Sequence, residues 1–186
     1  MKTGKIQPIL YFFFFFTFCY SYICLAQQKY GVLVIGDKIH FESKVLNEQK
    51  TIVVIPPYNY KDMPNEKFPV VYVLDVGNNL FASFGIINYY SVVLKTLPPM
   101  IIVGIVSSDR EKDYLPSSSK EYPTGGGADK FLRFISSELI NFIDSTYPAA
   151  SDRCIIGHSA GGLFAIYALE NRPELFNSFI CIDPSL

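Results

Sequence analysis

The first part of the chain shows extended runs in which apolar and polar positions partly alternate. Residues 30–36 and 38–45 carry such runs and predict a β-hairpin, and residues 50–57 form a third run that ends in two prolines. These three runs predict extended strands.

The pattern changes after residue 66. Residues 67–75 and 98–107 are short, continuous apolar runs, which are typical of strands covered on both faces of a parallel sheet. The mixed segment 78–95 between them is long enough for a helix. This order of strand, helix and strand predicts a parallel pair with a crossover connection.

A polar stretch and an amphipathic stretch follow. Residues 108–127 contain two prolines, three serines in a row and three consecutive glycines, and we expect a loop. Over residues 128–147, Phe131, Ile135 and Leu139 recur at intervals of four, which predicts an amphipathic helix.

The last third of the chain repeats the parallel pattern. Residues 152–157 and 178–183 are predicted strands, and residues 160–171 between them form a predicted helix. The whole order predicts an α/β fold: a three-layer sandwich around a mostly parallel sheet, in one domain over residues 27–186.

Composition supports a folded chain and excludes two classes of partner. The 186 residues are 49% hydrophobic, enough for a core, and the net charge is −1. So balanced a charge gives no general attraction to nucleic acid or to anionic lipid. We expect neither as a partner.

The N-terminus predicts a targeting segment. Two lysines precede an apolar run, and small residues stand before Gln27, which is the pattern of a signal peptide over residues 1–26 cleaved after Ala26. The alternative is an uncleaved membrane anchor, because residues 8–26 nearly reach the length that spans a bilayer. A lipoprotein is disfavoured by the bulky side chains before Cys24. We therefore expect an exported protein, periplasmic or secreted, in contact with a membrane only if this segment is retained.

Cysteines and histidines are few. Cleavage would leave Cys154 and Cys181, each within an apolar run; the compartment permits a disulfide, and two buried, inert thiols are the simpler interpretation. The only histidines of the printed sequence are His40 and His158, and neither has cysteines or carboxylates grouped around it. We expect no metal site and no cofactor.

One motif indicates chemistry. Gly157, His158, Ser159, Ala160 and Gly161 match G-x-S-x-G between a predicted strand and a predicted helix, which is the context of a nucleophile elbow. In that turn the serine hydroxyl is held above the carboxyl edge of the sheet, and small neighbours let strand and helix approach. The alternative is a glycine-rich turn whose serine only caps the helix.

An elbow requires donors for the oxyanion that forms when Ser159 attacks an acyl carbon. The main-chain N–H of Ala160 is the first candidate. The second should come from the loop after the strand at 67–75, where Gly77 and Asn78 are the candidates. Alternatively this segment is an ordinary strand-to-helix connection in which Asn78 or Asn79 caps the helix, and the two roles can coexist.

Several separated segments resemble, in order and spacing, the α/β-hydrolase family named "putative esterase", and within it the predicted hydrolases related to ferric enterobactin and bacillibactin esterases. The resemblance covers residues 33–186 and is carried by these segments: FPVVYVLD, IIVGIVSSDREKDYLP, GGGADKFLRFISSELINFIDSTYP, GHSAGGLFAIYALENRPELF and IDPSL. It implies Ser159 as nucleophile, oxyanion donors near Ala160 and Gly77, and a small-molecule ester as substrate. The family commonly has glycine directly after the strand-ending aspartate, whereas this chain has Val76 before Gly77.

The resemblance leaves the serine without a base. In α/β-hydrolases the acid and the histidine follow the serine along the chain, and no histidine follows Ser159 in the printed sequence. His158 neighbours the serine but should project elsewhere, and His40 should lie at the far edge of the sheet. We therefore expect a C-terminally truncated hydrolase, without the last strands and helices of its fold and nearly inactive as it stands.

Three functions remain open from the sequence. The first is an exported serine esterase acting on siderophore trilactones, acylated sugars or small acyl thioesters; the second is a non-catalytic binding module on a hydrolase scaffold; the third is an acyltransferase. Arg110 and Asp113, in the predicted loop, are candidates for substrate contact, with surface charges paired to each other or to water as the alternative.

Overall fold

The computed structural model describes residues 31 and 33–185, and the predicted leader at 1–26 lies outside the described residues. The account below concerns the compact unit Ile35–Leu186. In the described part of the chain, no helix combines the length and the apolar character needed to cross a membrane.

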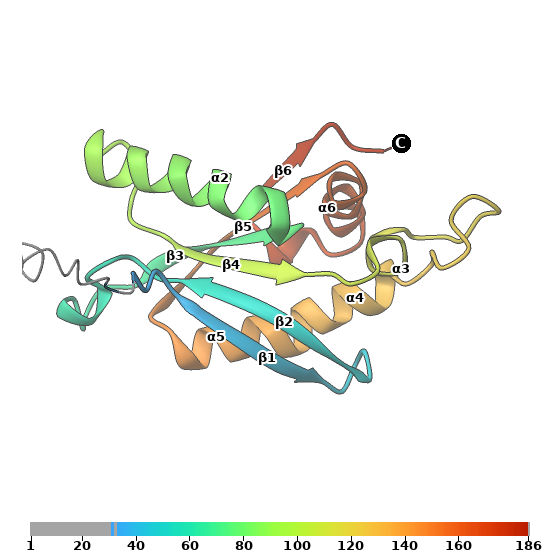
Figure 1. The fold of residues 1–186 in the computed structure, drawn as a ribbon, viewed down its shortest axis with the longest axis horizontal. Helices are drawn as coiled ribbons and strands as arrows, with labels where there is room; N and C mark the ends of the chain where they lie inside the picture. Colours follow the sequence, from blue (N-terminus) through green and yellow to red (C-terminus); the bar gives the residue numbers. More distant parts are fainter. Residues whose placement is uncertain (1–30, 32, 186) are drawn as a thin grey trace, which may run out of the picture. The chain divides into compact units, whose positions relative to one another are not determined.

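The unit is built on a mixed sheet of six strands in the order β1-β2-β4-β3-β5-β6 (Figure 1). β1 and β2 pair antiparallel, as do β2 and β4, while β4, β3, β5 and β6 run parallel. The strands are β1 (Asp37–Ser43), β2 (Glu48–Ile55), β3 (Phe68–Leu74), β4 (Ile101–Val106), β5 (Ala149–His158) and β6 (Ser178–Ile182).

Helices cover both faces of the sheet. They are α2 (Val76–Asn88), α3 (Arg110–Tyr114), α4 (Ala128–Phe134), α5 (Ile140–Thr146) and α6 (Ala160–Asn171). Short 3₁₀ turns occur at Tyr60–Asp62 and Pro173–Leu175, and π-helical turns extend α2 over Tyr89–Val93 and join α4 to α5 over Ile135–Leu139.

Two apolar cores separate these layers. The larger packs the sheet against α4, α5 and α6, with Tyr72, Phe131 and Phe164 completely buried in it. The smaller packs the opposite face against α2 through Val73, Leu80 and neighbouring residues. The expected α/β sandwich with a mostly parallel sheet is therefore confirmed.

Three details differ from the sequence predictions. The hairpin is formed by β1 and β2, and residues 31 and 33–36 carry no strand. The predicted loop at 108–127 begins with the helix α3. The predicted helix over 128–147 is one continuous helical stretch, but it contains a π-helical turn at its middle.

Candidate active site

Ser159 is the single residue between β5 and α6, and its backbone has φ 55° and ψ −121°. Few residues with a side chain adopt a positive φ, and such strain at one position persists only where the surroundings enforce it. The strand-to-helix turn predicted from the motif is thus present with the expected sharp bend.

Glycine makes this bend possible. A Cβ atom on Gly157 would overlap the carbonyl oxygen of Gly161, so the strand and helix can approach only because position 157 has no side chain. A Cβ atom on Gly161 would lie 3.0 Å from Asp75 Oδ2. The elbow is therefore packed directly against the end of β3.

The segment after β6 also holds the elbow. The N–H of Ser159 donates to the carbonyl of Ile182 at 3.0 Å, and the N–H of Ser185 donates to the carbonyl of Ser159 at 3.2 Å. The hydroxyl oxygens of Ser159 and Ser185 lie 3.0 Å apart, at hydrogen-bond distance. Ser185 was not singled out from the sequence, since only the fold brings it to the serine 26 residues earlier.

A cavity of about 360 Å³ opens in front of Ser159, at the carboxyl edge of the parallel strands. Its walls come from the β3–α2 junction, the end of β4, the start of α3 and the elbow, and include residues 75–77, Ser107, Arg110, His158 and Ser159. Ligand sites of open α/β sheets occur at this edge. The serine is therefore exposed to a space that a small molecule can enter.

Two helices begin at this cavity. In α2 the first intrahelical bond runs from the N–H of Asn79 to the carbonyl of Asp75, and in α6 it runs from the N–H of Leu163 to the carbonyl of Ser159. The N–H groups before these bonds have no partner within the helix. They include those of the predicted donors: Gly77, Asn78 and Ala160.

The predicted donors lie at different places in this arrangement. Gly77 lines the cavity, and Ala160 directly follows Ser159 at the start of α6. Asn78 is the third residue of α2, between Gly77 and the first bonded amide.

Arg110 lines the cavity and forms a two-pronged ion pair with Asp75. Its Nε donates to Oδ1 at 2.6 Å and its Nη2 donates to Oδ2 at 2.9 Å. The hydrogen bond to Asp75 raises the pKa of Arg110 above its ordinary value. The Arg110 side chain is 46% exposed, whereas the Asp75 side chain is 13% exposed. No local sequence pattern indicates that these residues, 35 positions apart, are in contact.

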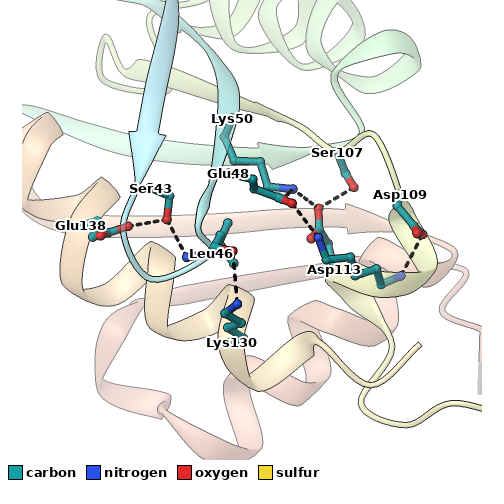
Figure 2. A network of polar contacts seen from close by, with 10 residues as sticks. Ser43, Leu46, Glu48, Lys50, Ser107, Asp109, Asp113, Lys130 and Glu138 are labelled. Carbon is teal, nitrogen blue, oxygen red and sulfur yellow. Dashed lines mark hydrogen bonds and ion pairs between the residues drawn. The ribbon is translucent and has the colours of Figure 1, made fainter. Parts of the chain in front are cut away.

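Asp113 is not placed to contact a substrate, contrary to one expectation from the sequence. It is 2% exposed, and it accepts hydrogen bonds from Lys50 Nζ at 2.5 Å and from Ser107 Oγ at 2.6 Å (Figure 2). It is also absent from the residues that line the cavity. Its carboxylate holds α3 to β2 and β4.

The structure places the two histidines at different parts of the sheet. His158 is exposed, is the last residue of β5 directly before the serine, and lines the same cavity. His40 is exposed on β1, at the opposite edge of the sheet from β6. In the part of the chain described, the side-chain partner of Ser159 Oγ is Ser185, and no histidine or carboxylate bonds to it.

Cysteines and metal ligands add no chemistry to this site. Cys154 and Cys181 are free and half-buried, and burial raises the pKa of Cys154 to about 11 and raises that of Cys181 as well. Both thiols are therefore protonated at neutral pH. No group of three or more metal-ligating side chains occurs among the described residues.

Comparisons with known proteins identify relatives of this chain. The family model described as "Putative esterase" matches residues 43–186. Over 164 residues the chain is 30% identical to ferri-bacillibactin esterase BesA of Bacillus subtilis, covering 75% of this chain and 55% of that protein. Over 161 residues it is 30% identical to the siderophore triacetylfusarinine C esterase of Aspergillus fumigatus, covering 75% and 52%.

A solved structure supports the same comparison. The crystal structure of an IroE-like serine hydrolase from Shewanella oneidensis superposes with a TM-score of 0.77 at 31% identity, over 81% of this chain and 51% of that one. The chain therefore spans about half the length of the proteins that it matches.

Proposed function

From the premise that this chain belongs to the family described as "Putative esterase", we propose that it carries the nucleophile and the oxyanion donors of a serine ester hydrolase. The observation that supports this most directly is the strained Ser159, exposed to a cavity at which two helices begin. No part of this proposal requires a metal or a cofactor.

The first half of the reaction forms an acyl-enzyme. Ser159 Oγ attacks the ester carbonyl carbon and loses its proton to a general base, and the carbonyl oxygen becomes an oxyanion. The N–H groups of Ala160 and Gly77 stabilise that charge, because they lie at the amino ends of α6 and α2 and have no partner within their helices. As the intermediate collapses, the C–O bond to the leaving group breaks and the protonated base gives its proton to that oxygen, which releases the alcohol. Water, deprotonated by the same base, then adds to the acyl-enzyme, and breaking of the bond to Ser159 Oγ releases the acid.

The base is not supplied by the described side chains. Loss of the histidine from a serine triad lowers turnover by about 10⁶-fold and leaves roughly 10³–10⁴ over water from the oxyanion donors and binding. We propose that these 186 residues, without an added base, cleave esters only at such a residual rate.

The proposed substrate class is a siderophore ester. This rests on two relatives whose names state esterase activity on ferri-bacillibactin and on triacetylfusarinine C. The cavity of about 360 Å³ can take an acyl group and its ester linkage, but not a whole siderophore, most of which would extend into solvent.

A fluorophosphonate probe tests the nucleophile. The purified chain is incubated with the probe at rising imidazole concentration, which supplies an external base, and the labelled residue is found by mass spectrometry. We expect a phosphonyl group on Ser159, faster labelling with more imidazole, and none in Ser159→Ala. A folded chain that stays unlabelled at Ser159 at every imidazole concentration contradicts the proposal and supports a binding module.

Substrate class requires a second measurement. Hydrolysis of a catecholate trilactone is compared with that of an acetylated sugar, in imidazole, for the chain and for Ser159→Ala. Ser159-dependent release of acid from the trilactone supports the siderophore class. Transfer of the acyl group to an added sugar, detected in the products, supports an acyltransferase instead.

A further inference from the structure

We infer that Arg110 is a positioning residue that keeps the oxyanion donors of α2 open by holding the Asp75 carboxylate away from them. The inference rests on the proposed function, because it concerns donors that matter only if Ser159 attacks an acyl carbon. It assigns Arg110 a role that acts through Asp75 and not by contact with the substrate.

The position of Asp75 would ordinarily make its side chain a helix cap. It is the residue directly before α2, and an aspartate at that position usually accepts a hydrogen bond from the second or third N–H of its helix. In α2 these are the N–H groups of Gly77 and Asn78. A capping carboxylate would therefore occupy a donor that the reaction needs and would place a negative charge where the oxyanion forms.

The structure has the carboxylate elsewhere. Among the described residues, Asp75 accepts no side-chain hydrogen bond from the first turn of α2, although its main-chain carbonyl accepts one from Asn79. Both of its carboxylate oxygens instead accept from Arg110. An arginine fork suits this task because it binds both oxygens of a carboxylate at once and fixes the plane of the group.

The backbone of Asp75 adds to the argument. Its φ and ψ are both 60°, in the left-handed region, so the junction between β3 and α2 is strained and is held by its surroundings. A Cβ atom on Gly161 would lie 3.0 Å from Asp75 Oδ2, which places this carboxylate beside the first turn of α6 as well. An unneutralised charge at this point would oppose an oxyanion at either helix.

Arg110 is itself firmly anchored. It is the first residue of α3, and Asp113 of the same helix is bound by Lys50 and Ser107 in the buried network of Figure 2. The neighbouring Lys112 Nζ adds a 2.6 Å ion pair to Glu48. These contacts with β2 and with Ser107, the residue after β4, hold the backbone of α3 in place. They therefore also hold the side chain of Arg110 where it can bind Asp75.

Four variants test the role through phosphonylation of Ser159. Arg110→Ala frees the carboxylate to cap α2, and we expect the maximal labelling rate to fall by about 100-fold, the effect of losing one oxyanion donor, with little change in the probe concentration at half-maximal rate. Asp75→Gly removes the carboxylate and tolerates the positive φ. We expect the labelling rate of the double variant, Asp75→Gly with Arg110→Ala, to lie within about threefold of the rate of Asp75→Gly alone. The control Arg133→Ala removes an exposed arginine of α4, and we expect it to be labelled at the rate of the unchanged chain.

The labelling rate of the double variant distinguishes the proposed role of Arg110 from an ion pair that only stabilises the fold. If Arg110 and Asp75 only stabilise the fold, the double variant is no faster than Arg110→Ala. A double variant as slow as Arg110→Ala, or an Arg110→Ala chain that labels at the unchanged rate, overturns the inference.

Amide hydrogen exchange tests the same role of Arg110 in a way that does not depend on reaction at Ser159. In Arg110→Ala we expect slower exchange at the amide of Gly77 or Asn78, which gains a capping acceptor, and fast exchange again in the double variant. Equal or faster exchange of both amides in Arg110→Ala overturns the inference, whatever the labelling shows. If the unchanged chain is not phosphonylated at all, the proposed function fails, and the amides still decide whether Arg110 restrains the Asp75 carboxylate.

Discussion

Lys50 of β2 and Asp113 of α3 form an ion pair in which Nζ and Oδ2 lie 2.5 Å apart, with only 3% and 2% of the side chains exposed. Sixty-three residues separate them along the chain. The pair joins the antiparallel part of the sheet to the helix from which Arg110 reaches the cavity.

Breaking the buried pair from one side should be costly. Lys50→Met leaves the Asp113 charge buried and unpaired, and we expect a loss of about 3–5 kcal/mol in the free energy of unfolding, measured by urea denaturation. Replacing both partners, as Lys50→Met with Asp113→Leu, should recover most of that loss. The control Lys112→Met breaks a more exposed pair to Glu48 and should cost about 1 kcal/mol or less. Equal losses for the two lysine variants would contradict the burial argument.

Glu48 should make stability depend on pH in the acidic range. Burial raises its pKa, but hydrogen bonds from Lys112 and Lys50 outweigh burial and lower the pKa below the ordinary 4.5. The folded state therefore favours the ionised form, and this contribution is complete above pH 4.5 and is lost as pH falls through the lower, folded-state pKa. We expect the urea midpoints of the unchanged chain and Glu48→Gln to differ most at neutral pH and to converge below pH 4.5. A gap that widens on acidification would reverse the sign and contradict the prediction.

Replacing a glycine by alanine should lower stability at the elbow and raise it within α2. At position 157 the new Cβ atom would overlap a main-chain oxygen of Gly161, and we expect a loss of about 3 kcal/mol, near the upper end of overpacking costs. Gly85, in the interior of α2, has nothing within 4 Å of an added Cβ atom, and Gly85→Ala should gain about 0.5–1 kcal/mol. Thermal denaturation of both variants checks the contrast, and a stable Gly157→Ala chain would mean that strand and helix are farther apart than described.

The sequence predicts best the elements that are specified by residues close together along the chain. The continuous apolar runs became β3 and β4, and the motif around Ser159 became a strand-to-helix turn, because each is specified by a local pattern. The predicted pairing of residues 30–36 with residues 38–45 is wrong, because partial alternation indicates an extended chain without indicating which runs pair. α3 was missed because five mostly charged residues in a polar stretch have no apolar period.

The remaining features of the site depend on contacts between distant residues. A charged residue such as Asp113 is expected at the surface unless a partner is known, and its partner Lys50 lies in the polar first half of β2. The Arg110–Asp75 and Ser159–Ser185 contacts likewise join residues 35 and 26 positions apart. Local patterns thus located the nucleophile, whereas the groups that orient its surroundings required the fold.

The strained backbone of Ser159 should be measurable as stored free energy. Its φ of 55° and ψ of −121° are accessible to glycine but cost a residue with a Cβ atom about 1–3 kcal/mol. Ser159→Gly and Ser159→Ala both remove the hydroxyl and its contact with Ser185, so their difference reports the backbone alone. Glycine also has greater freedom in the unfolded chain, which offsets about 0.4–1 kcal/mol of the relieved strain. We therefore expect the free energy of unfolding of Ser159→Gly to exceed that of Ser159→Ala by about 1 kcal/mol.

A matched change in regular helix gives the opposite sign. Ala82 is exposed in α2, where Ala82→Gly should cost about 1 kcal/mol in urea denaturation. If glycine destabilised position 159 relative to alanine, as it should position 82, the serine would occupy an ordinary helical conformation. Its hydroxyl would then not be held above the carboxyl edge of the sheet, and the geometric basis for attack on an ester would be lost.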